Sequence, residues 1–174
     1  EVGLVTWIPY LTADIGSVLG GWVSGRSIAR GMEPVAARKR VMLVCASVMP
    51  LGLLVAYSES NVVAVATICL ITFAHMGWKT NQMTMTNDIY PTSIIGSVSG
   101  IVGLGSSLSS VIFTRITGIV VENYSYATIF VVMAFLHPTA YVLLEALVRG
   151  GVEEDGPGSS SAPPGYERAE AKAA

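Results

Sequence analysis

The sequence predicts an all-α integral membrane protein with five transmembrane helices. Of its 174 residues, 52% are hydrophobic and 13% are charged, and the mean hydropathy is +0.59. A soluble domain usually carries about a quarter charged residues. This composition excludes a disordered chain and argues against a soluble enzyme. The net charge of −2 argues against an electrostatic nucleic-acid binder.

Five apolar segments are long enough to span a membrane, since a bilayer core of roughly 30 Å needs about 20 helical residues. The expected spans are residues 3–27, 41–58, 62–90, 94–121 and 126–148. The connections between later spans are short, which makes neighbouring helices antiparallel. Cys45 and Cys69 lie inside apolar runs, so we expect small buried side chains and neither a disulfide nor a metal site.

Basic residues indicate how the spans are oriented, because Lys and Arg concentrate on the cytoplasmic side. The connection between the first two spans carries five cations, namely Arg26, Arg30, Arg38, Lys39 and Arg40. The loops after the second and fourth spans carry none. We therefore expect this connection and the C-terminus to be cytoplasmic.

Five spans with a cytoplasmic C-terminus place Glu1 outside, yet no signal peptide precedes it. We therefore expect upstream spans to be missing, so that residues 1–149 form a partial C-terminal transmembrane bundle. The alternative is a short protein with a naturally external N-terminus. Residues 150–174 are rich in Gly, Pro, Ser and charge, which predicts a disordered cytoplasmic tail.

The third span continues past its apolar half as HMGWKTNQMTMTND, residues 75–88. Helical spacing places His75, Lys79, Gln82 and Thr86 within an arc of about 60°. A lysine at mid-depth costs several kcal/mol against lipid, so Lys79 must face protein, water or an anion.

Two interpretations of this arc stay open. Lys79 pairs with an acid across the bundle, or it holds an anionic substrate. In the second case Asn81 and Gln82 supply hydrogen bonds and Trp78 forms an apolar wall. His75 is a ligand, a proton site or a packing residue.

The first span carries Asp14 at mid-helix, and a carboxylate inside a membrane indicates a functional site. Lys79 is its suggested partner. Gly16 and Gly20 are typical of close helix packing. The fourth span has ten Gly or Ser among residues 96–110, which indicates either packing or a helix that slides beside a polar path.

The sequence contains no P-loop, no HExxH pair and no nucleophile elbow. We therefore expect no enzyme activity, no cofactor and no metal. An electron-transfer subunit would need paired haem ligands, for which His75 and His137 are the available histidines.

Several strings resemble the major facilitator superfamily, and more closely its anion:cation symporter branch with the bacterial hexuronate transporters. They are IPYLTADIGSVLGGWVSGRSIARG at 8–31, ARKR at 37–40, AHMGWKTN at 74–81 and DIYPTSIIGSVSGIVG at 88–103. The resemblance implies a twelve-helix transporter with substrate bound between two halves. This chain would supply its eighth to twelfth helices.

The resemblance also implies site residues. Asp14 matches the acid of the family's ADIG stretch, and His75, Trp78 and Asn81 match its H-x-G-W-x-x-N pattern. The matches to the cytoplasmic gate motif are Gly21, Arg26, Arg30 and Gly31. The expected substrate-binding residues are Asp14, His75, Trp78, Lys79, Asn81 and Gln82.

The resulting hypothesis is proton-coupled import of a sugar acid such as a hexuronate, in the inner membrane and together with a missing N-terminal half. The alternative is a transport-inactive truncated membrane protein with an interaction or assembly role. The DNA just upstream of the Glu1 codon separates the two hypotheses.

Overall fold

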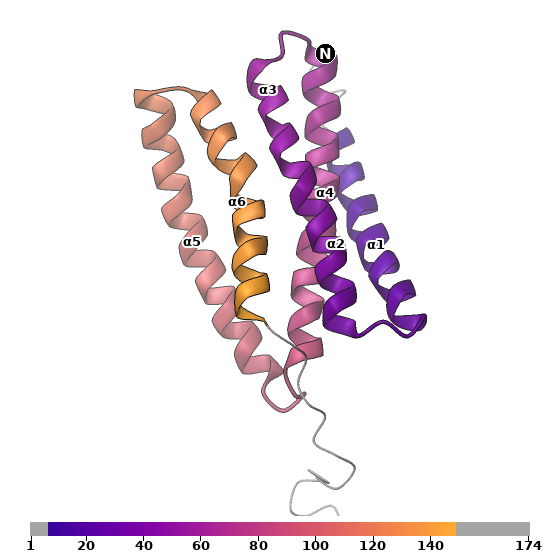
Figure 1. The fold of residues 1–174 in the computed structure, drawn as a ribbon. Coiled ribbons are helices and arrows are strands. Elements are labelled where there is room, and N and C mark those ends of the chain that lie inside the picture. The colour runs from indigo at the N-terminus through magenta and orange to yellow at the C-terminus, as the bar shows by residue number, and fades with distance from the viewer. Residues whose placement is uncertain (1–6, 149–174) are drawn as a thin grey trace, which may run out of the picture.

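The structure, a computed structural model, describes residues 7–148, and the regular secondary structure in this range is helical. Figure 1 shows the order of the helices. They are α1 (Ile8–Ala29), α2 (Pro34–Val48), η2 (Met49–Gly52), α3 (Leu53–Tyr57), α4 (Asn61–Ile89), α5 (Ile95–Asn123) and α6 (Tyr126–Leu147). The expected tail at 150–174 lies outside the described residues.

Four stretches of helix are long and apolar enough to cross a membrane, namely Pro34–Tyr57, Asn61–Ile89, Ile95–Asn123 and Tyr126–Leu147. They coincide with the second to fifth expected spans, which confirms the all-α class. The first expected span corresponds to α1, which has 22 residues but is not among the four. Polar residues such as Thr12, Asp14 and Ser17 reduce its hydropathy.

The second membrane helix begins earlier than the expected residue 41. Pro34 occupies the first turn of α2, and the Glu33 carboxylate accepts hydrogen bonds from the backbone N–H groups of Val35 (2.9 Å) and Ala36 (2.6 Å). These are strong helix-start features. Residues 38–40 therefore lie within α2 and not in the connection, which is reduced to residues 30–33. The sequence interpretation used apolarity to locate the helix and so missed its charged first turns.

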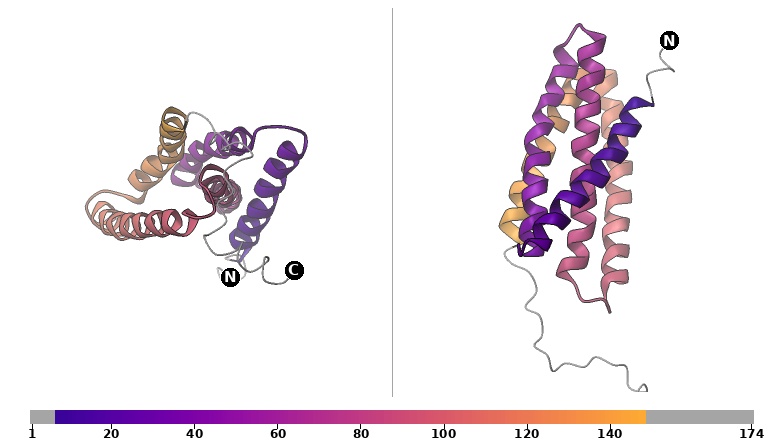
Figure 2. Two further views of the ribbon diagram at one scale, coloured as in Figure 1. Left: turned by 90° about the horizontal axis from the view of Figure 1, so that it is seen from below. Right: turned by 90° about the vertical axis from the view of Figure 1, so that its right-hand side faces the viewer.

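α4 is the central helix and packs against α1 and α2, while α6 packs against α2, η2 and α3 (Figure 1). α1 crosses α4 obliquely (Figure 2). The core joins α2, η2 and α4, and its members are Val35, Met42, Cys45, Ala46, Met49, Ala74, Trp78 and Met85. Cys45 is buried and Cys69 is half-buried, and both are free thiols. α5 buries none of its residues in this bundle.

Glycines allow α1 and α4 to approach closely. A Cβ atom added to Gly20 would lie 2.7 Å from the Cα atom of Gly77, and one added to Gly16 would lie 2.8 Å from the Cα atom of Phe73. The packing interpretation of Gly16 and Gly20 is therefore confirmed. The packing role suggested for the glycines of the fourth span is not seen within residues 7–148, where a Cβ added to Gly96, Gly100 or Gly103 meets nothing within 4 Å.

Candidate functional site

Side-chain hydrogen bonds join α1 to α4 beside the glycine contact. The Ser17 and Thr80 hydroxyl groups lie 2.8 Å apart. The Asn81 side-chain amide donates to the backbone carbonyls of Gly20 (3.1 Å) and Gly77 (2.9 Å). Hydrogen bonds of this kind stabilise helix pairs in a membrane by roughly 1 kcal/mol each. α1 and α4 therefore form one unit, on which the candidate site residues are placed.

Asp14 and Lys79 do not pair in this structure, so the suggested ion pair is wrong. Within residues 7–148 the ion pairs are Arg38–Asp88 and Lys39–Glu145. Asp14 comes two residues before Gly16, and Lys79 two residues after Gly77. Because each residue of a helix turns by about 100°, both charges point away from the α1–α4 contact. Both residues are exposed.

Asp14 and Lys79 nevertheless lie on the same side of the α1–α4 pair. Ser17 follows Asp14 by about one turn, and it hydrogen-bonds to Thr80, the residue after Lys79. On α1, Asp14 lies on the opposite side of the helix from Val23, and Val23 lines a groove between α1 and α2. We call the side formed by Asp14, Ser17, Lys79 and Thr80 the polar face. It looks away from α2.

The predicted arc on α4 is present, with α4 helical throughout residues 75–86. His75, Lys79 and Gln82 are exposed, and Thr86 is half-buried. The arc begins with a contact to α6, because the His75 Nδ1 atom lies 3.0 Å from the His137 Nε2 atom. The two rings meet edge to face, with centroids 5.2 Å apart.

Trp78 and Asn81 do not belong to the exposed arc. Trp78 is 6% exposed, and its ring packs edge-on against His137 at 5.5 Å and Tyr141 at 6.4 Å. Asn81 is fully buried in the α1–α4 contact. In this conformation Trp78 supports the position of α6, and Asn81 supports that of α1. Of the predicted substrate-binding residues, a ligand can therefore reach Asp14, His75, Lys79 and Gln82.

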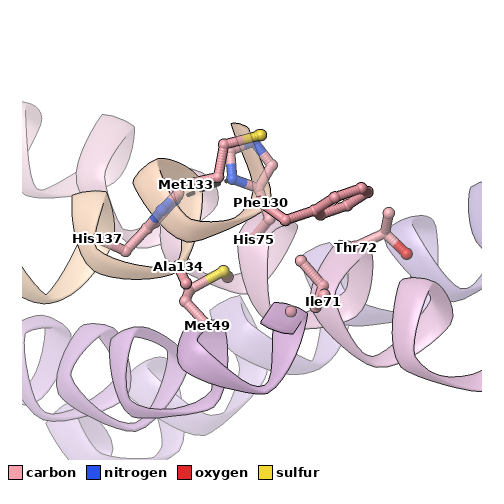
Figure 3. A pocket seen from close by; sticks show the side chains of 9 residues that line it. Met49, Ile71, Thr72, His75, Phe130, Met133, Ala134 and His137 are labelled. Carbon is pink, nitrogen blue, oxygen red and sulfur yellow. Dashed lines mark hydrogen bonds between the residues drawn. The ribbon is translucent and has the colours of Figure 1, made fainter. Parts of the chain in front are cut away.

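A cavity of about 230 Å³ lies between η2, α4 and α6, next to the histidine pair (Figure 3). Its walls include Met49, Ile71 and Phe130. The 3.0 Å between His75 and His137 is a hydrogen-bond distance. Two nitrogen ligands on opposite sides of a metal ion lie about 4 Å apart. This arrangement does not support the haem-ligand hypothesis. The sequence interpretation paired His137 with His75 only as haem ligands and did not place it beside the substrate-binding residues.

Of the expected gate residues, Arg26, Arg30 and Gly31 lie at or just before the turn after α1, whereas Gly21 lies within α1. None of the four forms an ion pair within the described chain. Arg26 lies over the Trp22 ring at 5.7 Å. Arg30 follows α1 directly, and Gly31 adopts φ +91°, a conformation that favours glycine. A Cβ added to Gly21 would touch the Thr80 methyl group at 3.5 Å.

The shorter of two ion pairs at this end joins Arg38 to Asp88, and the sequence interpretation missed it. Arg38 Nε donates to Asp88 Oδ2 at 2.6 Å, and Arg38 Nη1 donates to Ser24 Oγ at 3.0 Å. Arg38 is 9% exposed and Ser24 is fully buried. One guanidinium therefore joins α1, α2 and α4. The available signal was an acid in the last turn of α4, shortly before Pro91.

Lys39 makes a second connection at the same end, between α2 and α6. Its ammonium lies 3.4 Å from Glu145 Oε2 and donates to the Val148 backbone carbonyl. The Tyr141 hydroxyl also donates to Glu145, at 3.4 Å. Glu145 is largely exposed, with a side-chain fraction of 56%. The contact therefore belongs to the surface of the bundle.

Residues 1–171 match the sequence profile of the Major Facilitator Superfamily. The Hexuronate transporter of Escherichia coli (strain K12) is 26% identical over 149 residues, which are 85% of this chain and 33% of that protein. The D-galactonate transporter of Escherichia coli O6:H1 is 21% identical over 147 residues, which are 83% of this chain and 34% of that protein. Probable anion transporter 1, chloroplastic, of Oryza sativa is 26% identical over 143 residues, which are 79% of this chain and 26% of that protein. The chain thus spans about a quarter to a third of the length of these relatives.

Proposed function

Since the chain belongs to the Major Facilitator Superfamily, we propose that it contributes five membrane helices to a secondary transporter of sugar acids or related organic anions. In this assignment α1 is the eighth helix, Pro34–Tyr57 the ninth, and α4, α5 and α6 the tenth to twelfth. The names of the relatives support this substrate class, since they include a hexuronate transporter, a D-galactonate transporter and a probable galactarate/D-glucarate transporter.

Lys79 is the observation that carries the proposal. It lies about 15 Å from the C-terminal end of α4, roughly half the thickness of a bilayer core. It is exposed and forms no ion pair within residues 7–148. An unpaired ammonium at that depth is costly unless it borders water or an anion. A path for anions along the polar face provides both.

The expected substrate residues on this path are Asp14, His75, Lys79 and Gln82, while Trp78 and Asn81 hold the helices that carry them. Lys79 attracts the carboxylate of the substrate, and Gln82 donates hydrogen bonds to its oxygen atoms. Alternating access then exposes this site to each side of the membrane in turn.

Proton coupling fits the same residues. Protonation of Asp14 removes the negative charge beside the anion path, and the His75–His137 pair is a second place for a proton. A proton bound in one state biases the equilibrium between inward-facing and outward-facing states. We assign the protein to the inner membrane, with the α1–α2 turn and the C-terminus cytoplasmic.

Uptake of radiolabelled glucuronate tests the proposal in cells that lack their own hexuronate carriers. The cells produce the complete gene product that carries this chain. We expect uptake that falls when the proton gradient is collapsed, and at least a tenfold loss in Lys79→Gln, equivalent to about 1.4 kcal/mol.

Arg115→Gln is the matched control, because Arg115 is another exposed cation in a membrane helix. Equal losses in both variants would contradict the assignment of Lys79. No uptake of any sugar acid by a well-expressed protein would favour the transport-inactive alternative.

A further inference from the structure

A second cavity, of about 510 Å³, lies between α1 and α2 with α4 as its floor. It is on the opposite side of α1 from Asp14, so it is separate from the polar face. Leu19 and Val23 of α1 and Val41 and Val44 of α2 form its walls. Leu19, Val23 and Val44 remain more than a third exposed. We call this space the α1–α2 groove.

The groove has the length of one membrane leaflet. Along α1 its lining runs from Gly16 to Ser27, which is about 16 Å at the helical rise. One leaflet contributes about half of a hydrocarbon core of roughly 30 Å. The groove ends beside the α1–α2 turn, at the end of the bundle to which the basic residues assign the cytoplasmic surface. An acyl chain of that leaflet therefore matches it in length and chemistry.

A cation stands at the mouth of the groove. Arg40 and Ser27 line that end, and Arg40 is exposed. Within residues 7–148 Arg40 forms no ion pair, whereas the neighbouring Arg38 and Lys39 each pair with an acid.

The nearby carboxylates are engaged elsewhere. Glu33 caps the α2 backbone, Asp88 pairs with Arg38, and Glu145 pairs with Lys39. The guanidinium of Arg40 is therefore available to an anion that lies at the membrane surface.

We propose that the α1–α2 groove is a binding site for an anionic glycerophospholipid, with one acyl chain between α1 and α2 and the phosphate on Arg40. The site is distinct from the transport path, so it does not depend on which anion is carried. It requires that the bundle lie in a membrane and that the other helices of the transporter leave the groove open to lipid.

Native mass spectrometry of the full chain in detergent tests the site, with dioleoylphosphatidylglycerol and dioleoylphosphatidylcholine as competing lipids. We expect phosphatidylglycerol to be preferred. A basic residue near a membrane surface contributes about 1 kcal/mol toward an anionic lipid, so Arg40→Gln should weaken phosphatidylglycerol binding about fivefold. Arg115→Gln, the control for loss of one positive charge, should leave it unchanged.

A second pair of variants tests the acyl-chain part of the groove. Val44→Phe narrows it, whereas Leu43→Phe places the same ring on the neighbouring residue, which does not line it. We expect Val44→Phe to reduce the binding of both lipids and Leu43→Phe to reduce neither. Equal binding of the two lipids by the unaltered chain would overturn the proposal. So would equal losses in Arg40→Gln and Arg115→Gln.

Discussion

Replacing Asp88 by alanine should destabilise the bundle more than any single change at its exposed charges. The substitution leaves Arg38, which is 9% exposed, without its carboxylate. Arg38 then keeps only the Ser24 hydroxyl as a partner. A nearly buried guanidinium with one neutral partner is poorly solvated, and the contact of α2 with the end of α4 is lost.

The geometry sets the expected size of the effect. At an effective dielectric constant of about 20, charges 2.6 Å apart attract by about 6 kcal/mol, before the cost of removing both from water. Breaking a buried pair by removing one partner typically costs about 3–5 kcal/mol. The Asp88 side chain is 20% exposed, so water recovers part of the loss and we expect about 3 kcal/mol.

The free energy of unfolding is measured on the purified full chain in mild detergent, by circular dichroism during chemical denaturation. Glu145→Ala is the matched control, because it removes the partner of the adjacent Lys39. That pair is longer, at 3.4 Å, and Glu145 is 56% exposed, so its loss should cost less than about 1 kcal/mol.

A double variant separates the pair from general damage. Arg38→Met with Asp88→Leu removes both charges and keeps apolar volume, so it should recover most of the stability lost in Asp88→Ala. The reasoning is refuted if Asp88→Ala and Glu145→Ala lose the same free energy. It is also refuted if the double variant is no more stable than Asp88→Ala.

Three further predictions concern the α1–α4 pair and its polar face. Gly20→Ala should lower the free energy of unfolding by about 1–3 kcal/mol, because the added methyl group meets Gly77. Gly25→Ala is the control and should cause no measurable loss, because a Cβ there meets nothing within 4 Å. Equal losses in the two variants would contradict the close contact. Asn81→Ala should cost about 1 kcal/mol in the same assay by removing the bond to the Gly20 carbonyl, and an unchanged stability would argue against that bond. Lys79→Gln should lose glucuronate uptake without losing stability, because its ammonium forms no ion pair within residues 7–148; a matching loss of stability would indicate a structural role.

The sequence alone predicted those features that depend on residues close to one another along the chain. Hydropathy predicted five spans, and the structure has four helices that are long and apolar enough to cross a membrane. Helical spacing placed His75, Lys79 and Gln82 on one exposed side. The Gly16–Gly20 spacing predicted a close helix contact, which the structure contains. These properties follow from composition and the helical repeat alone.

Other features depend on how one helix is rotated against another, which a single sequence does not fix. Asn81 lies between two arc residues in sequence, yet the rotation of α4 turns it into the contact with α1. The partners Arg38 and Asp88 are 50 positions apart, and each belongs to a string that was interpreted separately. The Asp14–Lys79 hypothesis failed for the same reason, because two charges at similar depth were assumed to face each other.

In the proposed transporter, Asp14 and Lys79 border one aqueous path on the polar face. Substituted-cysteine labelling tests it most directly, in the complete gene product in membrane vesicles, with Cys45 and Cys69 replaced by alanine. We expect a membrane-impermeant thiol reagent to modify Asp14→Cys, Ser17→Cys and Lys79→Cys. We expect glucuronate to slow the reaction of Ser17→Cys, which keeps both Asp14 and Lys79. Val23→Cys, on the opposite side of α1, should stay unmodified. Labelling of Val23→Cys at the same rate as the other three positions, with no protection of Ser17→Cys by glucuronate, would contradict an aqueous anion path along the polar face.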